Sequence, residues 1–256
     1  MKYKETAVIT EQEKIAADIY SMWLQTERIA KEAVPGQFLS VYSKDESRML
    51  PRPISICQVE QAAGRIRLVY RIAGKGTKEF SGYGTGDTLE LVGPLGNGFP
   101  LDKGYEKVLL VGGGIGIPPM VELSAKLSGE KLIVAGYRNS ELFLKNELEK
   151  NGNLYLASED GSVGTKGNVL DAIRENNLSG QAVFACGPAP MLRALKDYAA
   201  EKRMDCYLSL EERMACGVGA CLACVCHSMD VDAHTHVKNK RICKDGPVFA
   251  AEEIEL

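Results

Sequence analysis

Cysteines near the C-terminus carry the clearest chemical signal in this 256-residue chain. Cys216, Cys221 and Cys224 are separated by four and two residues, and Cys243 follows from a distant segment. This is the ligand spacing of a plant-type [2Fe–2S] cluster, in which two irons require four thiolates. The residues between the first three cysteines are small, so backbone N–H groups can approach the sulfur atoms and tune the reduction potential. The pattern predicts a cluster bound by Cys216, Cys221, Cys224 and Cys243.

Two other uses of these cysteines remain open from sequence. A four-cysteine zinc site usually has two Cys-x2–4-Cys pairs, whereas Cys243 has no paired neighbour. A structural or disulfide role is the other alternative. His227, His234 and His236 lie close by and could complete a Cys/His site, although a place in surface loops explains them more simply. Cys226 is left over and is not expected to be a ligand.

A glycine-rich turn lies in the middle of the chain. Residues 108–120 read as strand, turn and helix, and the turn contains Gly112, Gly113, Gly114 and Gly116. Such a turn brings backbone N–H groups and a helix N-terminus close to a pyrophosphate, which predicts a nucleotide site. The alternative is a tight strand–helix turn without a ligand. Pro119 replaces the third glycine of Gly-x-Gly-x-x-Gly, which favours a related α/β nucleotide domain over an ordinary Rossmann dehydrogenase.

A second group of residues, nearer the N-terminus, suits a flavin nucleotide. Arg52 would neutralise a phosphate, Ser55 would hydrogen-bond a ring nitrogen, and Tyr70 would stack on or edge an aromatic ring. Gly76 and Thr77 would start a short helix facing a pyrophosphate. Each signal is weak alone, but their order ahead of a nucleotide domain predicts an FAD site. Its full set is Arg52, Pro53, Ile54, Ser55, Val69, Tyr70, Arg71, Gly76 and Thr77.

The elements that must position these groups fall into three parts. Residues 1–101 predict an antiparallel barrel or sandwich, with strands at 6–9, 19–25, 37–42, 53–59, 65–72 and 88–92. Residues 102–210 predict a parallel sheet, with strands at 107–111, 132–137, 154–158, 182–186 and 206–210. Its helices are expected to end near 127 and to span 141–150, 168–176 and 188–202. Residues 211–256 lack clear periodicity and form a small module around the cysteines.

Composition and targeting signals exclude several classes of protein. Lys and Arg number 31 against 34 Asp and Glu, and a net charge of -3 argues against a nucleic-acid binder. The N-terminal residues 1–14 carry charges throughout, so a secretory signal is not expected. The longest apolar run, residues 108–121, is too short for a transmembrane helix. We therefore expect a cytoplasmic protein with reduced cysteines and neither a nucleic-acid nor a membrane partner.

Together the motifs resemble the ferredoxin–NADP reductase superfamily over essentially the whole chain. The matching motifs are Arg52-x-x-Ser55, Gly76-Thr77, Gly112 to Gly116 and Cys186-Gly187-Pro188. The C-terminal extension resembles the electron-transfer subunits of type B dihydroorotate dehydrogenases in residues 211–224 and 241–249. Residues 52–55 and 93–99 also look like that family. Ile54 departs from the superfamily, which usually has an aromatic residue there, so the flavin must pack differently.

The resemblance implies a fold and its cofactors. It implies an antiparallel Greek-key barrel that binds FAD, a parallel-sheet α/β domain that binds NAD, and a small C-terminal [2Fe–2S] module. The Cys186-Gly187-Pro188 loop would lie beside the nicotinamide and the flavin. There the Cys186 thiol would help hydride transfer, unless it is simply a small buried residue. No basic cluster follows the second strand of the α/β domain, which favours NAD over NADP.

The resemblance also implies a partner. Electrons would pass between NAD(H), FAD, the cluster and an FMN-containing catalytic subunit that oxidises dihydroorotate to orotate in pyrimidine (UMP) biosynthesis. The family assembles as a heterotetramer with two copies of each subunit. The present chain would have no dihydroorotate site of its own, and its chemistry requires no general base.

Two other functions are compatible with the motifs. One is an NAD(P)H:ferredoxin-type or sulfur-metabolism flavoprotein subunit of the same architecture, which the cluster ligands and basic residues for a 2′-phosphate would distinguish. The other is a redox-sensing or scaffold module with a zinc-like cysteine loop. The colour of the purified protein separates this second alternative from a flavin and iron–sulfur protein.

Overall fold

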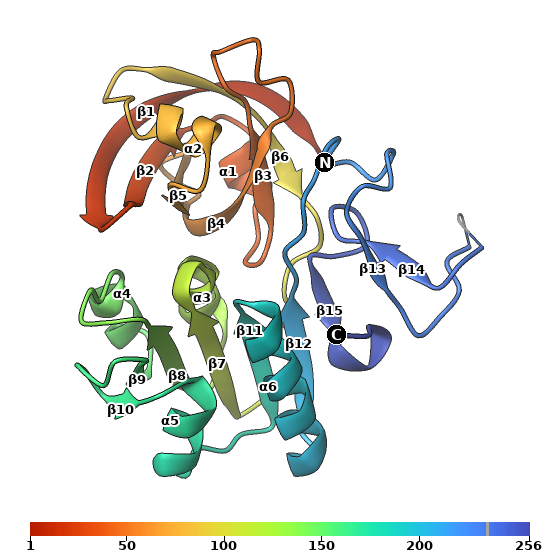
Figure 1. The fold of residues 1–256 in the computed structure, drawn as a ribbon. Helices are drawn as coiled ribbons and strands as arrows, with labels where there is room; N and C mark the ends of the chain where they lie inside the picture. Colours follow the sequence, from red (N-terminus) through yellow and green to blue (C-terminus); the bar gives the residue numbers. More distant parts are fainter. Residues whose placement is uncertain (234–235) are drawn as a thin grey trace.

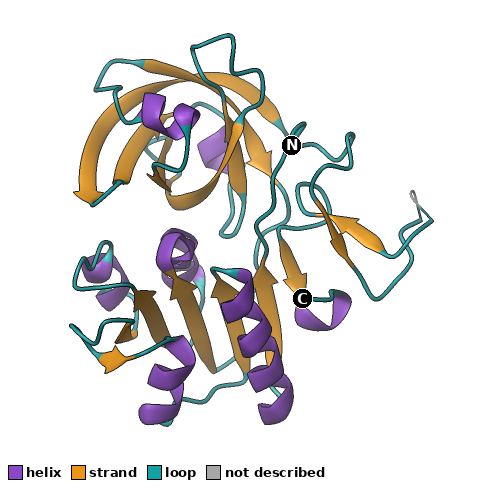
Figure 2. Cartoon of the chain, in the orientation of Figure 1, coloured by secondary structure: helices purple, strands orange, loops and turns teal. Residues whose placement is uncertain are grey.

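The computed structural model describes residues 1–233 and 236–256, which form three units in contact with one another. Figure 1 shows a barrel at one end, an α/β domain at the other, and the cysteine-containing segment beside both. Figure 2 shows that helices cover the α/β sheet, whereas the cysteine segment consists mainly of loops. Among the described residues, no helix has the length and apolarity needed to cross a membrane.

The N-terminal unit is a closed antiparallel barrel with strand order β1-β2-β5-β4-β3-β6. Its strands are β1 (Tyr3–Ala16), β2 (Ile19–Gln25), β3 (Phe38–Val41), β4 (Arg52–Glu60), β5 (Arg65–Arg71) and β6 (Thr88–Leu95). Strands β6, β3, β4 and β5 lie side by side in that order, which is a Greek key. The six predicted strands are confirmed, and the barrel is preferred over the sandwich. Two short helices, α1 (Ile29–Glu32) and α2 (Lys75–Phe80), lie between strands.

The α/β domain contains a seven-stranded sheet with order β10-β9-β8-β7-β11-β12-β15. Its parallel strands are β7 (Lys107–Gly113), β8 (Glu130–Tyr137), β9 (Asn153–Ser158), β10 (Thr165–Lys166), β11 (Ala182–Cys186) and β12 (Asp205–Ser209). Its helices are η1 (Gly114–Gly116), α3 (Ile117–Lys126), α4 (Lys145–Glu149), α5 (Val169–Glu175) and α6 (Ala189–Lys202). The alternating pattern is confirmed. The start of the helix expected at 141–150 is wrong, because Leu144 has a left-handed φ of 62° and α4 begins after it.

The cysteine segment is tied to the α/β sheet by an element that sequence reasoning missed. Strands β13 (Val225–His227) and β14 (Asn239–Arg241) form a small antiparallel pair. Strand β15 (Val248–Ala250) then joins the edge of the large sheet, antiparallel to β12, and η2 (Ala251–Glu253) follows. Three residues are too few for a strand pattern, so only the tertiary structure reveals this pairing.

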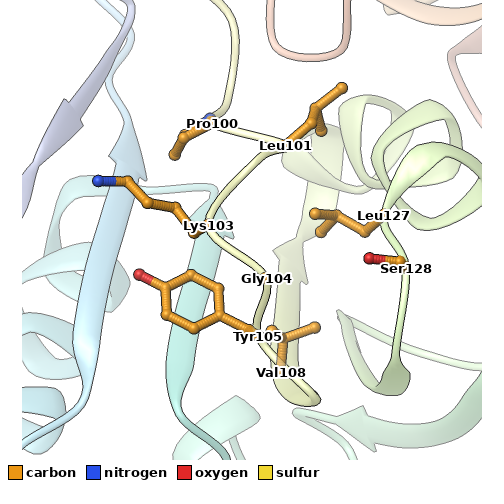
Figure 3. A pocket seen from close by; sticks show the side chains of 8 residues that line it. All are labelled: Pro100, Leu101, Lys103, Gly104, Tyr105, Val108, Leu127 and Ser128. Carbon is orange, nitrogen blue, oxygen red and sulfur yellow. The ribbon is translucent and has the colours of Figure 1, made fainter.

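The connection from the barrel to β7 covers the edge of the sheet where that strand begins. Figure 3 shows a small hollow there, lined by Pro100, Leu101, Lys103, Gly104, Tyr105, Val108, Leu127 and Ser128. Ligands of open α/β sheets bind at the carboxyl ends of the strands. The hollow lies at the start of β7, so it is at the opposite edge from the predicted nucleotide turn.

The barrel and the α/β domain share an apolar interface that buried polar contacts hold in register. Val69 of the barrel packs in one apolar cluster with Met120 of α3. Beside it, Glu122 is 4% exposed and accepts a 2.9 Å hydrogen bond from the Val59 N–H. Burial raises the pKa of Glu122, and this hydrogen bond and Lys126 oppose the rise. Each of these contacts fixes α3 against β4 or β5.

A partly buried ion pair supplies a further connection between the two units. Arg67 of β5 donates to Glu147 of α4 at 2.8 Å, to Gln58 at 2.7 Å and to Ser21 at 2.8 Å. The Arg67 side chain is only 9% exposed, and its guanidinium also lies 5.9 Å from the ring centroid of Trp23. Removing one partner of a buried pair leaves a charge without compensation.

We expect Glu147→Ala to lower the free energy of unfolding by about 1–3 kcal/mol, because Arg67 would lose its nearer carboxylate in a poorly hydrated site and keep only Glu13, 3.8 Å away. The control is Glu149→Ala in the same helix, which removes only a solvent-exposed pair with Lys145. That change should cost at most about 0.5 kcal/mol. Urea unfolding of the FAD-loaded protein measures both. Equal effects would contradict a stabilising role for the interdomain pair.

Candidate functional site

Two residues of the predicted FAD set, Arg52 of β4 and Gly76 of α2, lie in contact. Arg52, the first residue of β4, lies across the start of α2, and its side chain occupies the space that a Cβ on Gly76 would need. Arg52 also donates to the carbonyl of Leu50. Thr77 Oγ1 accepts the N–H groups of Ala73 at 2.9 Å and Gly74 at 3.2 Å. A cation therefore lies at the start of a short helix, an arrangement that suits a phosphate.

Tyr70 on β5 offers a hydroxyl to a ligand. Its side chain is 3% exposed, stacks on Tyr20 with ring centroids 6.0 Å apart, and meets Phe80 edge-on at 6.1 Å. The Tyr70 hydroxyl is buried and has no hydrogen-bond partner among the described residues. Burial raises its pKa well above the usual value. An unpaired buried hydroxyl is costly, so a cofactor that hydrogen-bonded it would relieve this cost.

The other predicted residues of β5 face the α/β domain. Val69 lies in the interdomain apolar cluster. The Nη2 atom of Arg71 lies 3.6 Å from the position that a Cβ on Gly114 would take. Arg71 belongs to the predicted FAD set and Gly114 to the predicted NAD set. The two sets therefore meet at this point of the domain interface.

The glycine turn and the Cys-Gly-Pro loop also lie against each other. Gly112 of β7 pairs in register with Cys186 of β11, so both motifs lie at the carboxyl ends of adjacent parallel strands. A Cβ on Gly116 would overlap the carbonyl of Cys186, and one on Gly113 would lie 2.5 Å from Met191 Sδ. At Gly116 only glycine permits this packing, because the neighbouring atoms belong to the backbone. Nucleotides bind at this edge in open α/β sheets, so the arrangement fits a nicotinamide nucleotide.

Cys186 is a neutral thiol at this point. Burial raises its pKa to about 12, although a hydrogen bond with Ser209 opposes the rise. The reactive form of a cysteine is the thiolate, which Cys186 does not reach near neutral pH. Its environment therefore suits a small, weakly polar group beside a cofactor and not a nucleophile.

The four predicted cluster ligands form two pairs. The Cys216 N–H lies 3.5 Å from Cys221 Sγ, and the Cys243 N–H lies 3.4 Å from Cys224 Sγ. Cys224 and Cys243 are 2% and 0% exposed, whereas Cys221 is exposed. In a [2Fe–2S] cluster with four thiolates, each iron takes two of them in addition to the bridging sulfides. Two pairs of thiols, one inner and one near the surface, fit such a cluster.

Backbone N–H groups point at the outer pair. Cys216 Sγ accepts the N–H of Val218 at 3.4 Å and that of Ala220 at 3.3 Å. Burial alone would raise the pKa of Cys216, but these bonds and contacts with Cys221 hold it at about 6. Burial and the neighbouring Cys224 raise the pKa of Cys243 to about 12. The hydrogen bonds of the outer loop therefore favour the thiolate form of Cys216 in the cluster-free protein.

The remaining candidates do not join the cysteines. Cys226 is half-buried and donates to the carbonyl of Lys240 at 3.6 Å, and burial raises its pKa. His227 and His236 are exposed, and His234 lies outside the described residues. Across residues 1–233 and 236–256, no three His, Cys, Asp or Glu side chains surround a single point as one metal ion requires.

The cluster loop also touches the barrel through a residue that sequence reasoning missed. A Cβ on Gly217 would lie 2.8 Å from Ser40 Oγ. Ser40 lies on β3 and pairs in register with Pro53 of the predicted FAD strand β4. The signal was present in the sequence, since Ser40 is the one polar residue of the buried strand Phe38–Val41. The barrel thus contacts the glycine turn on one side and the cysteine loop on the other.

Comparison with known proteins agrees with this geometry. The family model for the iron–sulfur cluster binding domain of dihydroorotate dehydrogenase B matches residues 211–255, and that for the oxidoreductase FAD-binding domain matches residues 6–99. The chain is 41% identical to the dihydroorotate dehydrogenase B (NAD(+)) electron transfer subunit of Geobacillus sp. (strain WCH70), over 100% of both chains. The same subunit of Bacillus cereus (strain B4264) is 40% identical, again over 100% of both.

Solved structures show the same fold. An NADH-dependent reduced ferredoxin-NADP oxidoreductase structure is 30% identical and superimposes with a TM-score of 0.88, covering 97% of this chain and 89% of that chain. A ferredoxin NADP+ reductase from Neisseria gonorrhoeae, with bound FAD and NADP, has a TM-score of 0.64 at 14% identity. It covers 77% of this chain and 91% of that chain, and at this identity the likeness concerns the fold alone.

The thiol environments predict selective alkylation of the cluster-free protein. We expect iodoacetamide to modify Cys216 with a half-maximal rate near pH 6, because the thiolate is the nucleophile. Cys206 is the control, since burial raises its pKa to about 12 and it should stay unmodified at neutral pH. Peptide mass spectrometry across a pH series measures both rates. Identical pH profiles for the two cysteines would contradict the assigned hydrogen bonding.

Proposed function

Because the chain belongs to the family of dihydroorotate dehydrogenase B (NAD(+)) electron transfer subunits, we propose that its three cofactor sites form one continuous electron path to a catalytic subunit. When bound, NAD(H) and FAD exchange a hydride, and FAD and the cluster exchange single electrons. We assign FAD to residues 1–101, NAD to residues 102–210 and the cluster to residues 211–256. The function of the chain is thus to connect dihydroorotate oxidation to NAD+ reduction in pyrimidine biosynthesis.

In the proposed FAD site, the barrel and α2 hold the nucleotide. Arg52 and the start of α2 at Gly76 and Thr77 bind the pyrophosphate. Tyr70 donates its hydroxyl to the cofactor, and Arg71 lies between the flavin and the glycine turn. Support comes from the contact of Arg52 with Gly76 and from the unpaired Tyr70 hydroxyl. Ser55 hydrogen-bonds a ring nitrogen, and Pro53, Ile54 and Val69 complete the proposed set.

In the proposed NAD site, the carboxyl ends of β7 and β11 hold the dinucleotide. The turn formed by Gly112, Gly113, Gly114 and Gly116 takes the pyrophosphate, because glycines allow close backbone approach. The loop of Cys186, Gly187 and Pro188 lies beside the nicotinamide. Support comes from the close packing of these two loops and from their position at the edge of the sheet.

In the proposed cluster site, Cys216 and Cys221 hold one iron, and Cys224 and Cys243 hold the other. The Cys216 N–H directed at Cys221 Sγ and the Cys243 N–H directed at Cys224 Sγ support this division. The first iron is then the outer one, since Cys221 is exposed and the second pair is buried. The N–H groups directed at Cys216 Sγ would stabilise its negative charge.

The proposed partner is an FMN-containing dihydroorotate dehydrogenase catalytic subunit, in a heterotetramer with two copies of each chain. It docks over the outer pair of cysteines. Exposed apolar side chains are frequent in the cysteine module, and a partner would bury them: Val218, Leu222, Val225, Met229, Val231 and Val237. We place the complex in the cytoplasm, where the cysteines stay reduced.

The observation that carries the proposal is that the barrel touches both other sites. Arg71 of the barrel lies 3.6 Å from the Cβ position of Gly114, and Ser40 lies 2.8 Å from that of Gly217. A flavin held by β4 and β5 therefore lies between the nicotinamide turn and the cysteine loop. This is the order that conversion between hydride and single-electron transfer requires.

The central experiment expresses the chain together with a dihydroorotate dehydrogenase catalytic subunit from the same organism. The purified complex should reduce NAD+ when given dihydroorotate, with a clear preference over NADP+, while either subunit alone should not. The likeness to the ferredoxin-NADP oxidoreductase structure makes a ferredoxin the second candidate acceptor. Reduction of ferredoxin by NADH, without complex formation or dihydroorotate-driven NAD+ reduction, would favour that second function.

We expect Cys221→Ser to abolish the cluster while FAD content and NADH-driven reduction of an artificial dye persist, because the dye accepts electrons at the flavin. Dihydroorotate-driven NAD+ reduction should fall to background. The matched control is Cys226→Ser, which changes a neighbouring cysteine outside the two pairs and should keep the cluster. Iron content and visible spectra measure loading. Loss of dye reduction in Cys221→Ser with FAD still bound would contradict the serial order of the sites.

A further inference from the structure

We propose that the flavin barrel holds both cluster-ligating segments at two points, and that these points set the separation between flavin and cluster. We call the three barrel residues involved, Ser40, Gly96 and Asn97, the barrel seat. They are positioning residues, because they act through the cysteine segments. The inference rests on the proposed function only in taking the barrel as the flavin site and the cysteines as the cluster site.

The first point lies beneath the outer cysteine loop. Gly217 follows Cys216 directly, has a φ of 68°, and approaches Ser40 so closely that a Cβ would lie 2.8 Å from Ser40 Oγ. The same Cβ would lie 3.5 Å from Leu95 Cδ1, on the neighbouring strand β6. Ser40 is 2% exposed and its strand is fully buried. The loop therefore rests on a surface that cannot move aside easily.

The second point lies beneath the turn that follows Cys243. The N–H of Asn97 donates to the carbonyl of Gly246 at 2.6 Å. The Asn97 side-chain amide donates to the carbonyls of Asp245 at 2.9 Å and Lys244 at 3.4 Å. Beside it, Gly96 leaves no room for a Cβ, which would lie 2.7 Å from the Gly246 carbonyl. Asn97 thus binds three consecutive carbonyls of residues 244–246.

These contacts also explain a motif that the cofactor sites leave unused. Residues 93–99 close the last barrel strand, and none of them belongs to the predicted FAD, NAD or cluster sets. In the structure this segment forms the connection between barrel and cysteine module. Because both ligand segments rest on the barrel, the cluster stays at a fixed distance from a flavin held by that barrel. Strand β15 ties the module to the α/β domain but follows the last ligand.

The seat predicts a specific kinetic signature. Displacing a cysteine segment lengthens the path from flavin to cluster but leaves the contact between Arg71 and the glycine turn unchanged. NADH should therefore reduce the flavin at the normal rate, while the cluster is reduced more slowly. A residue that only stabilised the fold would change both rates or neither. Stopped-flow absorbance of the loaded complex separates the two steps.

The first test compares two glycines of the same loop. Gly217→Ala and Gly219→Ala both place a side chain at positive φ, since Gly219 has a φ of 86°. A Cβ at 219 would lie 2.8 Å from Lys244 Cβ, within the cysteine module itself, whereas one at 217 would lie 2.8 Å from Ser40 Oγ on the barrel. With iron content equal to wild type, Gly217→Ala should slow cluster reduction by about fivefold or more relative to Gly219→Ala. Adding Ser40→Ala to Gly217→Ala should restore part of the rate, because it removes the colliding hydroxyl.

The second test does not depend on activity of the loaded enzyme. In FAD-loaded, cluster-free protein, Asn97→Ala should speed amide hydrogen exchange of residues 242–248 by about fivefold per lost hydrogen bond. The control is Asn176→Ala, which removes a 2.9 Å amide-to-carbonyl bond within α5 and its C-terminal end. That change should leave residues 242–248 unaffected.

The possible outcomes distinguish a failure of the barrel seat from a failure of the proposed function. If wild-type protein fails to reduce its cluster with NADH, the proposed function is wrong. If wild type transfers electrons but Gly217→Ala and Gly219→Ala slow the cluster equally, the first point of the seat is overturned. If Asn97→Ala and Asn176→Ala leave exchange of residues 242–248 alike, the second point is overturned. A Gly217→Ala chain that does not fold is replaced by Ser40→Leu, which enlarges the same contact from the barrel side and should produce the same slowing.

Discussion

The structure depends on close backbone approach at the places where its units meet. Cofactors that exchange electrons must lie near one another, yet each is held by a different part of the chain. The contact of Gly116 with the Cys186 carbonyl brings two loops of the nucleotide domain together, and that of Gly217 with Ser40 brings the cysteine loop onto the barrel. A single methyl group at either position would force its partner away. The units and loops that carry the proposed cofactor sites thus meet at positions where the chain carries no side chain.

Buried polar groups fix the frame in which these approaches occur. Apolar packing between α3 and the barrel is not directional, so it would allow small rotations between the domains. The buried carboxylate of Glu122 and the pair of Arg67 with Glu147 favour one relative orientation, because a rotation would break hydrogen bonds made by the buried Glu122 and Arg67 side chains. Orientation matters here, since the glycine turn and Arg71 face each other across the same interface. Stability and cofactor alignment therefore draw on the same contacts.

The sequence predicted what local patterns encode and missed what long-range pairing creates. Strand runs, the glycine turn and the cysteine spacing lie within short windows, so the barrel, the parallel sheet and the candidate ligands could be inferred. The pairing of Cys224 with Cys243, the contact of Arg71 with Gly114, and the addition of β15 to the sheet each join residues distant in the chain. The late start of α4 was not predicted, because the residue with the left-handed backbone is Leu144, and a leucine gives no sequence signal for that conformation. Tyr70 was expected at the flavin, but only the structure reveals that its hydroxyl is buried and unpaired among the described residues.

The barrel contacts both other units, and the two pairs of thiols differ in their exposure. The inner thiols, Cys224 and Cys243, are buried against the protein, whereas Cys221 is exposed. An iron held by the inner pair is shielded from water, and an iron held by the outer pair is open to a docking surface. The two irons would therefore lie in environments of different polarity. Low polarity and hydrogen bonds to sulfur both shift the reduction potential of a cluster, in opposite directions. The N–H groups directed at Cys216 stabilise charge on the outer side, which is the side that a partner subunit can reach. The two pairs of thiols therefore differ in their environment: one is buried within the protein and the other lies near the module surface.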